Sequence, residues 1–415
     1  MTGSKESFIS NFQSQEIIEE LRAQGKQYLD DLPVPNRKSE RWKYSPISKL
    51  VNSSLRTCSG EDVVWPEEIL PDPIPFLDSY RIVFRNGSYL SSLSDLPVDD
   101  DLICASLGEV KAEFKNEYHK KEWVGALNAS FHQGGVVLKV KKNSKLDRPL
   151  VIHHLTDGEN IASFPRHLIE LEEGAEAEVI VWSSATDKSS GMCNGMLEAN
   201  VAKNAYLKID KVCNEGGEVF KFSHEHINQE RDSRIKINTF TIKGYWVRNE
   251  LEIVAKGPGT DSVFNGAYMP SGNEHIDNHT IMDHAYPNGT SSELYRGIMY
   301  DKSTGVFNGK VFVRKDAQQT NAFQQNSNIV ADKGATINAK PELEIYADDV
   351  KCSHGCTVGQ FDNEALFYLK SRGIGNDEAK ALLVKAYVSD VINAIDREEV
   401  RNEILRLYSQ RHNWS

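Results

Sequence analysis

The sequence predicts a mainly β protein with helical segments at both ends. Between about residues 134 and 359, short β-rich runs alternate with Gly, Asn and Asp turns, and 18 of the 28 glycines lie between residues 151 and 360. In the last fifty residues the apolar side chains change to the 3.6-residue period of amphipathic helices. We expect a helical and mixed N-terminal region over residues 1–115, a β core over 116–360 and a helical domain over 361–415.

The first thirty residues predict a helix, because apolar residues such as Phe8, Phe12 and Leu21 recur at roughly helical spacing. Gly25 weakens its centre. The helix should end before Pro33, since a residue that precedes proline avoids the α conformation. A proline-rich stretch over residues 65–76 then predicts an extended connector.

The β core shows strict alternation in many runs, for example Leu168 and Glu170 against Ile169 and Leu171. Alternation places one set of side chains in a core and the other in water. Because no helical crossovers interrupt the strands, the architectures that remain are a sandwich, a barrel or a β-helix. Frequent turns without tight Asn-Gly hairpins favour stacked coils. No fixed repeat length is visible, so the residues alone leave a β-helix and a sandwich equally open.

Three helices are expected after the β core. The first is short, contains Phe367 and ends near Gly373. Asn376 is the expected N-cap of the second, and Asp396 with Glu399 forms a predicted capping box for the third. The apolar stripe of the second helix contains Leu382, Leu383, Ala386, Tyr387, Val391, Ile392 and Ile395.

Composition excludes several functional classes. The chain has 48 Lys and Arg against 60 Asp and Glu, a formal net charge of −12, and an acidic surface repels nucleic acid. The mean hydropathy is −0.49 and no apolar run approaches twenty residues, so no membrane span is expected. The N-terminus carries no pattern of a secretory signal. Six cysteines without dense spacing fit reduced thiols, and we expect a cytoplasmic protein.

The cluster KCSHGCT over residues 351–357 is the first candidate for chemistry. Cys352, His354 and Cys356 occupy alternate positions, so in a strand they share one face. Thiolate and imidazole are ligands of zinc and of iron–sulfur centres. The alternative is that the cysteines are small buried hydrophobic residues beside a hydrogen-bonded histidine. No second cysteine pair has zinc-ribbon spacing, so a closed structural zinc site is not expected.

His224 and His226 form the second candidate. A His-x-His pair on one strand face is typical of cupin-like metal sites, which add a later Glu and a later His. The alternative is a set of polar residues on the solvent face of a β-rich domain. Candidate further ligands are His275, His279 and His284.

Other motifs are weaker. Asp348 and Asp349 could do acid–base work on a glycan, but adjacent residues of a strand point to opposite faces. The sequence contains no Walker A pattern and no G-x-S-x-G pattern. The residues alone therefore favour a binding or scaffold protein over a self-sufficient enzyme.

Two segments resemble a known family. The C-terminal signature of the SufB/SufD family, the scaffold proteins of SUF iron–sulfur cluster assembly, is similar to residues 326–374, NSNIVADKGATINAKPELEIYADDVKCSHGCTVGQFDNEALFYLKSRGI. The SufD branch of this family resembles residues 32–47, LPVPNRKSERWKYSPI. The matching positions of that second segment are Pro35, Glu40, Trp42, Lys43 and Tyr44. The resemblance extends over nearly the whole chain.

The resemblance implies a right-handed parallel β-helix core, which decides between the two architectures left open above. It also implies a non-catalytic scaffold subunit of a SufBCD complex, which pairs end to end with SufB and binds the ATPase SufC. In isolation such a chain could form a homodimer. The implied SufC-docking element comprises Phe367, Leu382, Leu383, Tyr387, Val391 and Ile395.

His354 matches the family histidine that faces the SufB cysteine where the nascent cluster is built, so the resemblance implies a transient iron–sulfur cluster or iron there and no cofactor on the isolated chain. Its imidazole would either ligate iron or orient or deprotonate the persulfide-carrying thiol. Cys352 also matches the family motif, with a core role as the alternative. Cys356 departs from the motif, which commonly has a small residue there, so it is either an inert substitution or an extra ligand. SufB itself has a cysteine upstream of this motif. Residues 321–330, NAFQQNSNIV, contain none, which favours the SufD branch.

Overall fold

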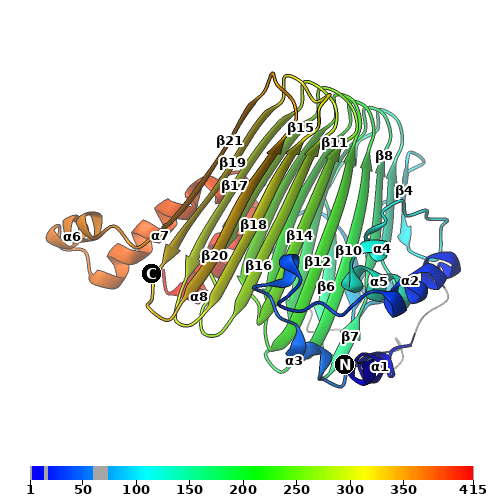
Figure 1. Ribbon diagram of the computed structural model, residues 1–415, viewed down its shortest axis with the longest axis horizontal. Coiled ribbons are helices and arrows are strands. Elements are labelled where there is room, and N and C mark those ends of the chain that lie inside the picture. Colours follow the sequence, from blue (N-terminus) through cyan, green and yellow to red (C-terminus); the bar gives the residue numbers. More distant parts are fainter. Residues whose placement is uncertain (1, 14–16, 59–72, 415) are drawn as a thin grey trace.

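The computed structural model describes residues 2–13, 17–58 and 73–414; residues 65–72 of the expected proline-rich connector lie outside them. Its centre is a parallel β-solenoid of about 8 turns, in which the chain alternates between two facing sheets (Figure 1). The mainly β class is confirmed, and the architecture is the β-helix rather than the sandwich.

Strands of the two sheets alternate along the chain. Sheet A contains β4 (Leu102–Ser106), β5 (Val136–Val140), β8 (Arg166–Leu171), β10 (Ser190–Val201), β12 (Glu218–Gln229), β14 (Trp246–Ala255), β16 (His275–His284), β18 (Thr304–Val313) and β20 (Thr336–Ile345), with β1 (Arg56–Thr57) and β7 (Ile161–Ser163) beside it. Sheet B contains β3 (Ser88–Tyr89), β2 (Tyr80–Arg85), β6 (Leu150–Thr156), β9 (Glu176–Ala185), β11 (Tyr206–Glu215), β13 (Arg234–Lys243), β15 (Asp261–Tyr268), β17 (Thr290–Met299), β19 (Asn321–Val330) and β21 (Lys351–Gly359).

Coils of unequal length explain why no fixed repeat is visible in the sequence. Phe220 pairs with Trp246, 26 positions further along, whereas Thr304 pairs with Thr336, 32 positions further. Turns absorb the difference, some with a left-handed residue such as Asn204 (φ 59°). Between the turns the strands stay in register, so inward side chains of successive coils stack into columns. Buried aliphatic residues of both sheets fill most of the interior between them.

The N-terminal segments cover the outer face of sheet A and pack on Trp246, Phe222 and their neighbours. The expected single helix is two helices, and the second ends before Pro33 as predicted. Gly25 allows this helix to approach another closely, because a Cβ there would lie 2.6 Å from the backbone nitrogen of Ser130. The elements are α1 (Thr2–Ile9), α2 (Glu19–Asp31), η1 (Glu40–Trp42), α3 (Ser48–Val51), α4 (Tyr118–Lys121) and α5 (Trp123–Phe131).

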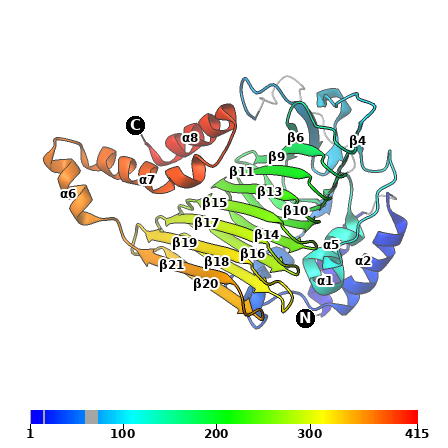
Figure 2. The same ribbon diagram turned by 90° about the horizontal axis from the view of Figure 1, so that it is seen from above.

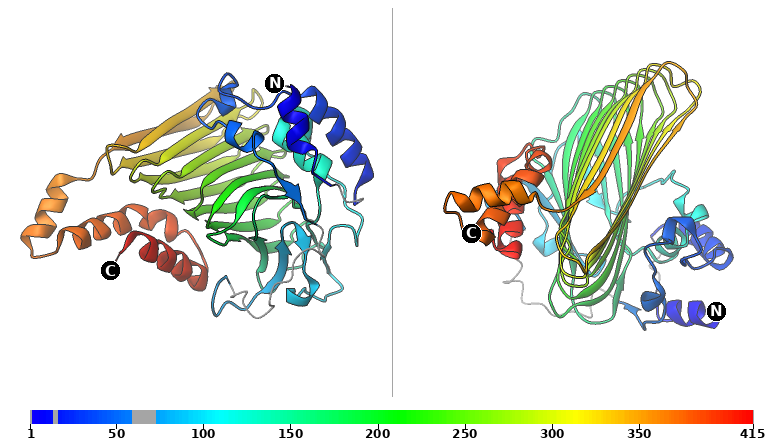
Figure 3. Two further views of the ribbon diagram at one scale, coloured as in Figure 1. Left: turned by 90° about the horizontal axis from the view of Figure 1, so that it is seen from below. Right: turned by 60° about the vertical axis from the view of Figure 1, so that its left-hand side comes forward.

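Three C-terminal helices follow the solenoid as predicted: α6 (Asn363–Ser371), α7 (Asn376–Ile392) and α8 (Glu398–His412). The last two pack on the outer face of sheet B, opposite the N-terminal segments (Figures 2 and 3). Tyr408 anchors α8 by donating hydrogen bonds to the carbonyls of Ala267 (2.9 Å) and Thr241 (3.2 Å). None of the described helices combines the length and hydropathy needed to cross a bilayer.

The predicted helix caps are wrong in both places. The N-cap of α7 is Gly375, and the N-cap of α8 is Arg397, neither with a side-chain cap. Asp396 instead binds Lys208 (2.5 Å) and Lys236 (2.6 Å) on sheet B, so an ion-pair contact with the sheet takes the carboxylate away from the helix end.

Candidate functional site

The last coil of the solenoid holds the cysteine–histidine cluster. Cys352, His354 and Cys356 lie on one face of β21, as the alternation predicts. In the register with β19 they stand over Ala322, Gln324 and Asn326, all of which are buried. The three side chains therefore occupy inward positions of the solenoid.

The cluster is open to solvent because no further described strand stacks on the last coil. Cys352 is half-buried and packs against the interior core, whereas His354 and Cys356 are exposed. The Cys356 Sγ lies 3.8 Å from Oδ1 of Asn326. Burial raises the pKa of both thiols, so in the free chain they are thiols rather than activated thiolates.

A polar column leads inward from His354. Gln324, directly beneath it, donates a hydrogen bond from Nε2 to Glu293 (2.8 Å), and Thr280 donates to the other carboxylate oxygen (2.6 Å). Burial raises the pKa of Glu293 to about 7. Sequence reasoning missed Gln324 and Glu293, because they precede His354 by 30 and 61 positions and become neighbours only through the coil register.

His224 and His226 lie on the outer face of sheet A, at the edge of the N-terminal segments. A ligand atom from each of them lies within 4.8 Å of one another and of a carboxylate oxygen of Glu252. The expected later Glu is therefore present. The expected later histidine is not among these three residues.

The three histidines of β16 have other partners. His275 hydrogen-bonds Ser45 (2.9 Å), His279 contacts Asp277 (3.0 Å), and His284 hydrogen-bonds Ser291 (2.9 Å). A parallel solenoid also differs from the jelly roll of the cupins. The acids at 348 and 349 lie exposed in the connection between β20 and β21.

The motif of residues 35–44 is a strap across sheet A. Trp42 is buried, its ring 4.0 Å from the Arg248 guanidinium, and its indole N–H donates to Glu122 (3.1 Å). Glu40 pairs with Lys340 of β20 (2.7 Å), so the strap reaches the last strand of sheet A. Pro35 is buried, whereas Lys43 and Tyr44 are exposed. The motif thus fastens the N-terminal region to the open end of the solenoid.

The residues expected to bind SufC divide into two groups. Phe367 of α6 is 74% exposed and Leu382 of α7 is 41% exposed, whereas Val391 and Ile395 are fully buried against sheet B. The remaining two, Leu383 and Tyr387, are half-buried.

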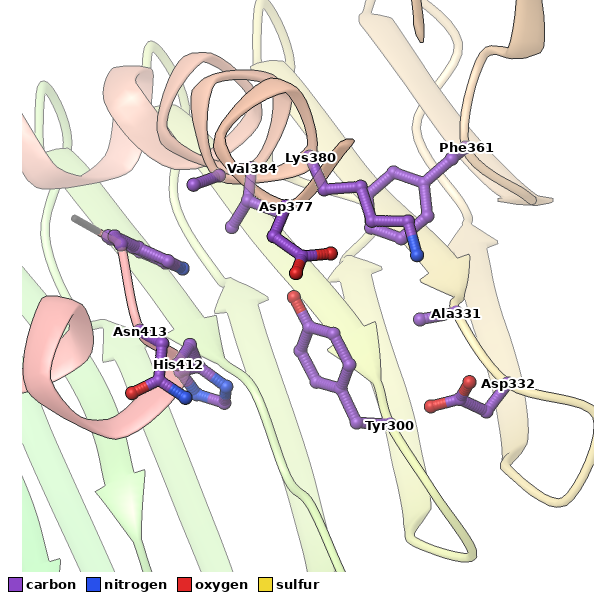
Figure 4. Close-up of a pocket in the computed structure, with 11 residues that line it drawn as sticks. Tyr300, Ala331, Asp332, Phe361, Asp377, Lys380, Val384, His412 and Asn413 are labelled. Carbon is purple, nitrogen blue, oxygen red and sulfur yellow. The ribbon is translucent and has the colours of Figure 1, made fainter. Parts of the chain in front are cut away.

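A pocket of about 280 Å³ separates the start of α7 from the solenoid (Figure 4). Side chains of Tyr300, Asp377, Lys380 and His412 point into it. The helix is nevertheless held to the body along its whole length, because its buried residues are Ala379, Ala381, Val384, Val388, Val391 and Ile392.

Comparisons with known proteins place the chain in a family. A family described as "SUF system FeS cluster assembly, SufBD core domain" matches residues 154–387, and "SufBD protein N-terminal region" matches residues 4–152. The iron–sulfur cluster assembly protein SufD of Escherichia coli K12 is 32% identical over 397 residues, 94% of this chain and 92% of the relative. SufD of Bacillus subtilis is 25% identical, covering 98% and 96%. Protein ABCI7, chloroplastic, of Arabidopsis thaliana is 27% identical, covering 93% and 84%. The chain therefore belongs to the SufBD family of the SUF system for iron–sulfur cluster assembly, and its full-length similarity supports the SufD branch.

Proposed function

We propose that this chain is a non-catalytic scaffold subunit in the cytoplasm, which pairs with SufB, binds the ATPase SufC and supplies His354 to a cluster-assembly site at the SufB contact. The observation that carries this proposal is the uncovered last coil, whose inward face holds His354 between two thiols. Family membership supports the role in iron–sulfur cluster assembly.

The open end of the solenoid supports an end-to-end partner. Among the described strands, β20 pairs with β18 alone and β21 with β19 alone, so each leaves one backbone edge free. Free strand edges are templates for pairing with another chain. The inward Ile337 and Leu343 of β20 are also left half-exposed. A second β-helix stacked on this end would pair with the free backbone groups of both strands and bury these side chains. In the absence of SufB, a second copy of this chain would occupy the same end.

The donor atoms around His354 suit iron. A neutral imidazole is an iron ligand, and a metal ion that binds a thiol displaces its proton even where burial raises the thiol pKa. Cys352 packs against the interior core, and Cys356 lies exposed on the last strand. A partner that covers the end of the solenoid would therefore bury both thiols together with His354. A transient cluster or iron atom held there would be shared between the two subunits.

The C-terminal helices suit a partner that moves. None of the described residues of α6 is buried, and this helix projects from the body with Phe367 and Tyr368 exposed (Figure 2). Val388 and Val391 hold α7 on sheet B. We assign SufC docking to Phe367, Leu382 and Leu383, through which ATP-driven motion would reach the solenoid.

Native mass spectrometry of the chain, purified without oxygen after co-expression with SufB and SufC, tests the proposal. We expect one copy with one SufB and two SufC chains, with bound iron and sulfide. His354→Ala should keep this mass and lose the iron and sulfide, because the ligand is removed from an exposed position. Ser353→Ala, next to it on the opposite strand face, should keep both. A lone homomer, or full iron and sulfide in His354→Ala, would contradict the proposal.

A further inference from the structure

We propose that His224, His226 and Glu252 bind one divalent first-row transition metal ion, at a site on sheet A that is separate from the last coil. The three residues offer two imidazole nitrogens and one carboxylate oxygen, all within 4.8 Å of one another. Two imidazoles and one carboxylate form a ligand set that suits Zn²⁺ and Fe²⁺. The inference does not rest on the proposed partners of this chain.

The strand register builds the site. In the parallel pair of β12 and β14, His224 stands opposite Glu250 and His226 stands opposite Glu252, and all four side chains are on the outer face. A tetrahedral ion with bonds of about 2.0–2.1 Å keeps its ligand atoms about 3.3 Å apart. Side-chain rotations that shorten the ligand separations by at most ~1.5 Å would therefore let the three residues bind one ion and leave the fourth position to water.

Charge selects Glu252 rather than Glu250 as the carboxylate ligand. Glu250 lies between two guanidinium groups, accepting from Arg248 Nε (2.6 Å) and Arg41 Nη2 (3.1 Å). Within the described part of the chain, Glu252 has one hydrogen-bond partner, Nδ1 of His226 (3.0 Å). Its carboxylate is therefore free to bind a cation through its remaining lone pairs.

The histidines are held in place for this role. The ring of His224 stacks on Tyr118 with centroids 3.7 Å apart, its Nδ1 lies 3.5 Å from Oε2 of Glu250, and its Nε2 lies 3.4 Å from Nδ2 of Asn116. These contacts fix the orientation of the ring, as neighbouring polar groups commonly do for histidines that bind metal ions. His226 is also contacted by Oδ1 of Asn228 (3.2 Å), an oxygen that could orient the ring or fill a further coordination position.

A metal ion can reach the site from solvent. The His226 side chain is 13% exposed and that of Glu252 is 31% exposed, whereas His224 is buried behind them. The nearby cation that acts on the Glu252 carboxylate besides the histidines is Lys121, which is itself exposed and screened by water. The site is therefore shallow: His224 is its buried ligand, and His226 and Glu252 are the ligands that solvent reaches.

The test is an anaerobic titration of the metal-free chain with Co²⁺, whose visible absorption reports its ligands, followed by displacement with Zn²⁺. Wild type should bind one ion per chain, and Co²⁺ should raise the thermal denaturation midpoint. His226→Ala and the isosteric Glu252→Gln should each weaken Co²⁺ binding by about 100-fold. Residues that only support a metal ligand already cost up to about this factor when they are replaced, so the loss of a ligand itself should reach it. Glu252 is partly exposed, so its variant should fold normally.

The matched control is the double variant Cys352→Ser, Cys356→Ser, which removes the other candidate ligands and should bind Co²⁺ like wild type. Absence of stoichiometric binding in wild type would overturn the inference. So would binding that persists in Glu252→Gln and is lost in the double serine variant. Native mass spectrometry with SufB and SufC should give the same assembly for Glu252→Gln as for wild type, so this result and the test at His354 can fail independently.

Discussion

Glu293→Gln should change how the stability of this protein depends on pH. Glu293 is fully enclosed in the solenoid, where its carboxylate accepts hydrogen bonds from Thr280 and Gln324. Burial nevertheless raises its pKa from an ordinary 4.5 to about 7. The two hydrogen bonds lower the pKa but do not offset the loss of solvation.

The sign and size follow from this shift. A carboxyl group whose pKa is raised in the folded state contributes stability that is fully present below pH 4.5 and is lost as the pH rises through 7. A shift from 4.5 to about 7 corresponds to about 3 kcal/mol, at about 1.36 kcal/mol per pKa unit. Glutamine is neutral throughout, so the variant lacks this pH dependence. Its amide can still bond Gln324, whose Oε1 has no hydrogen bond to the described residues.

Urea denaturation at a series of pH values from 5 to 8 measures the effect. The free energy of unfolding of Glu293→Gln minus that of wild type should grow by about 2–3 kcal/mol across this range. Asp349→Asn removes an exposed acid from a turn and should give a difference that stays near zero. Curves for Glu293→Gln and wild type that run parallel from pH 5 to 8 would refute the reasoning, because they would mean that Glu293 stays ionised throughout.

Three further predictions concern the helices and the strap. Trp42→Ala should lower the free energy of unfolding by about 3–5 kcal/mol in urea denaturation, because it empties the buried space between Arg248 and the N-terminal core; a loss under about 1 kcal/mol would show that the strap is not anchored there. Gly25→Val should cost about 1–3 kcal/mol, since its Cβ meets α5 backbone at 2.6 Å, and an unchanged melting temperature would contradict that helix contact. Phe367→Ser should leave the stability of the isolated chain within about 0.5 kcal/mol while weakening SufC capture on beads. The buried control Val388→Ala should do the reverse, losing about 2 kcal/mol of stability.

The sequence predicts the elements of this fold better than their arrangement. Alternation placed Cys352, His354 and Cys356 on one strand face, and helical periodicity located the three C-terminal helices, because both patterns are local. The residues alone did not separate a β-helix from a sandwich. That choice depends on how strands pair across coils of 26 to 32 residues, which local pattern does not encode. Only the resemblance to a known family predicted the β-helix.

Exposure of the cluster at His354 is likewise a property of position rather than of composition. In the same inward column, Gln324 and Glu293 are fully enclosed, and they differ from His354 in having a further coil stacked on them. An inward residue on the last coil therefore has the orientation of a core residue and the accessibility of a surface residue. A site built this way becomes enclosed only when a partner continues the stack.

The apolar stripe of α7 shows the same limit for helices. Leu382 and Val391 belong to one periodic pattern, yet the first is exposed and the second fully buried on sheet B. An apolar stripe at helical spacing predicts that one face of a helix will be covered. It does not tell whether the protein's own core or a partner covers that face, because both contacts use apolar side chains. The division follows the faces of α7 rather than its ends, because Ala381 and Val384, which flank Leu382, are buried in the same cluster as Val391. A helix fastened to the sheet along one face, with an exposed leucine on another face, can transmit a partner's movement to the strands that carry it.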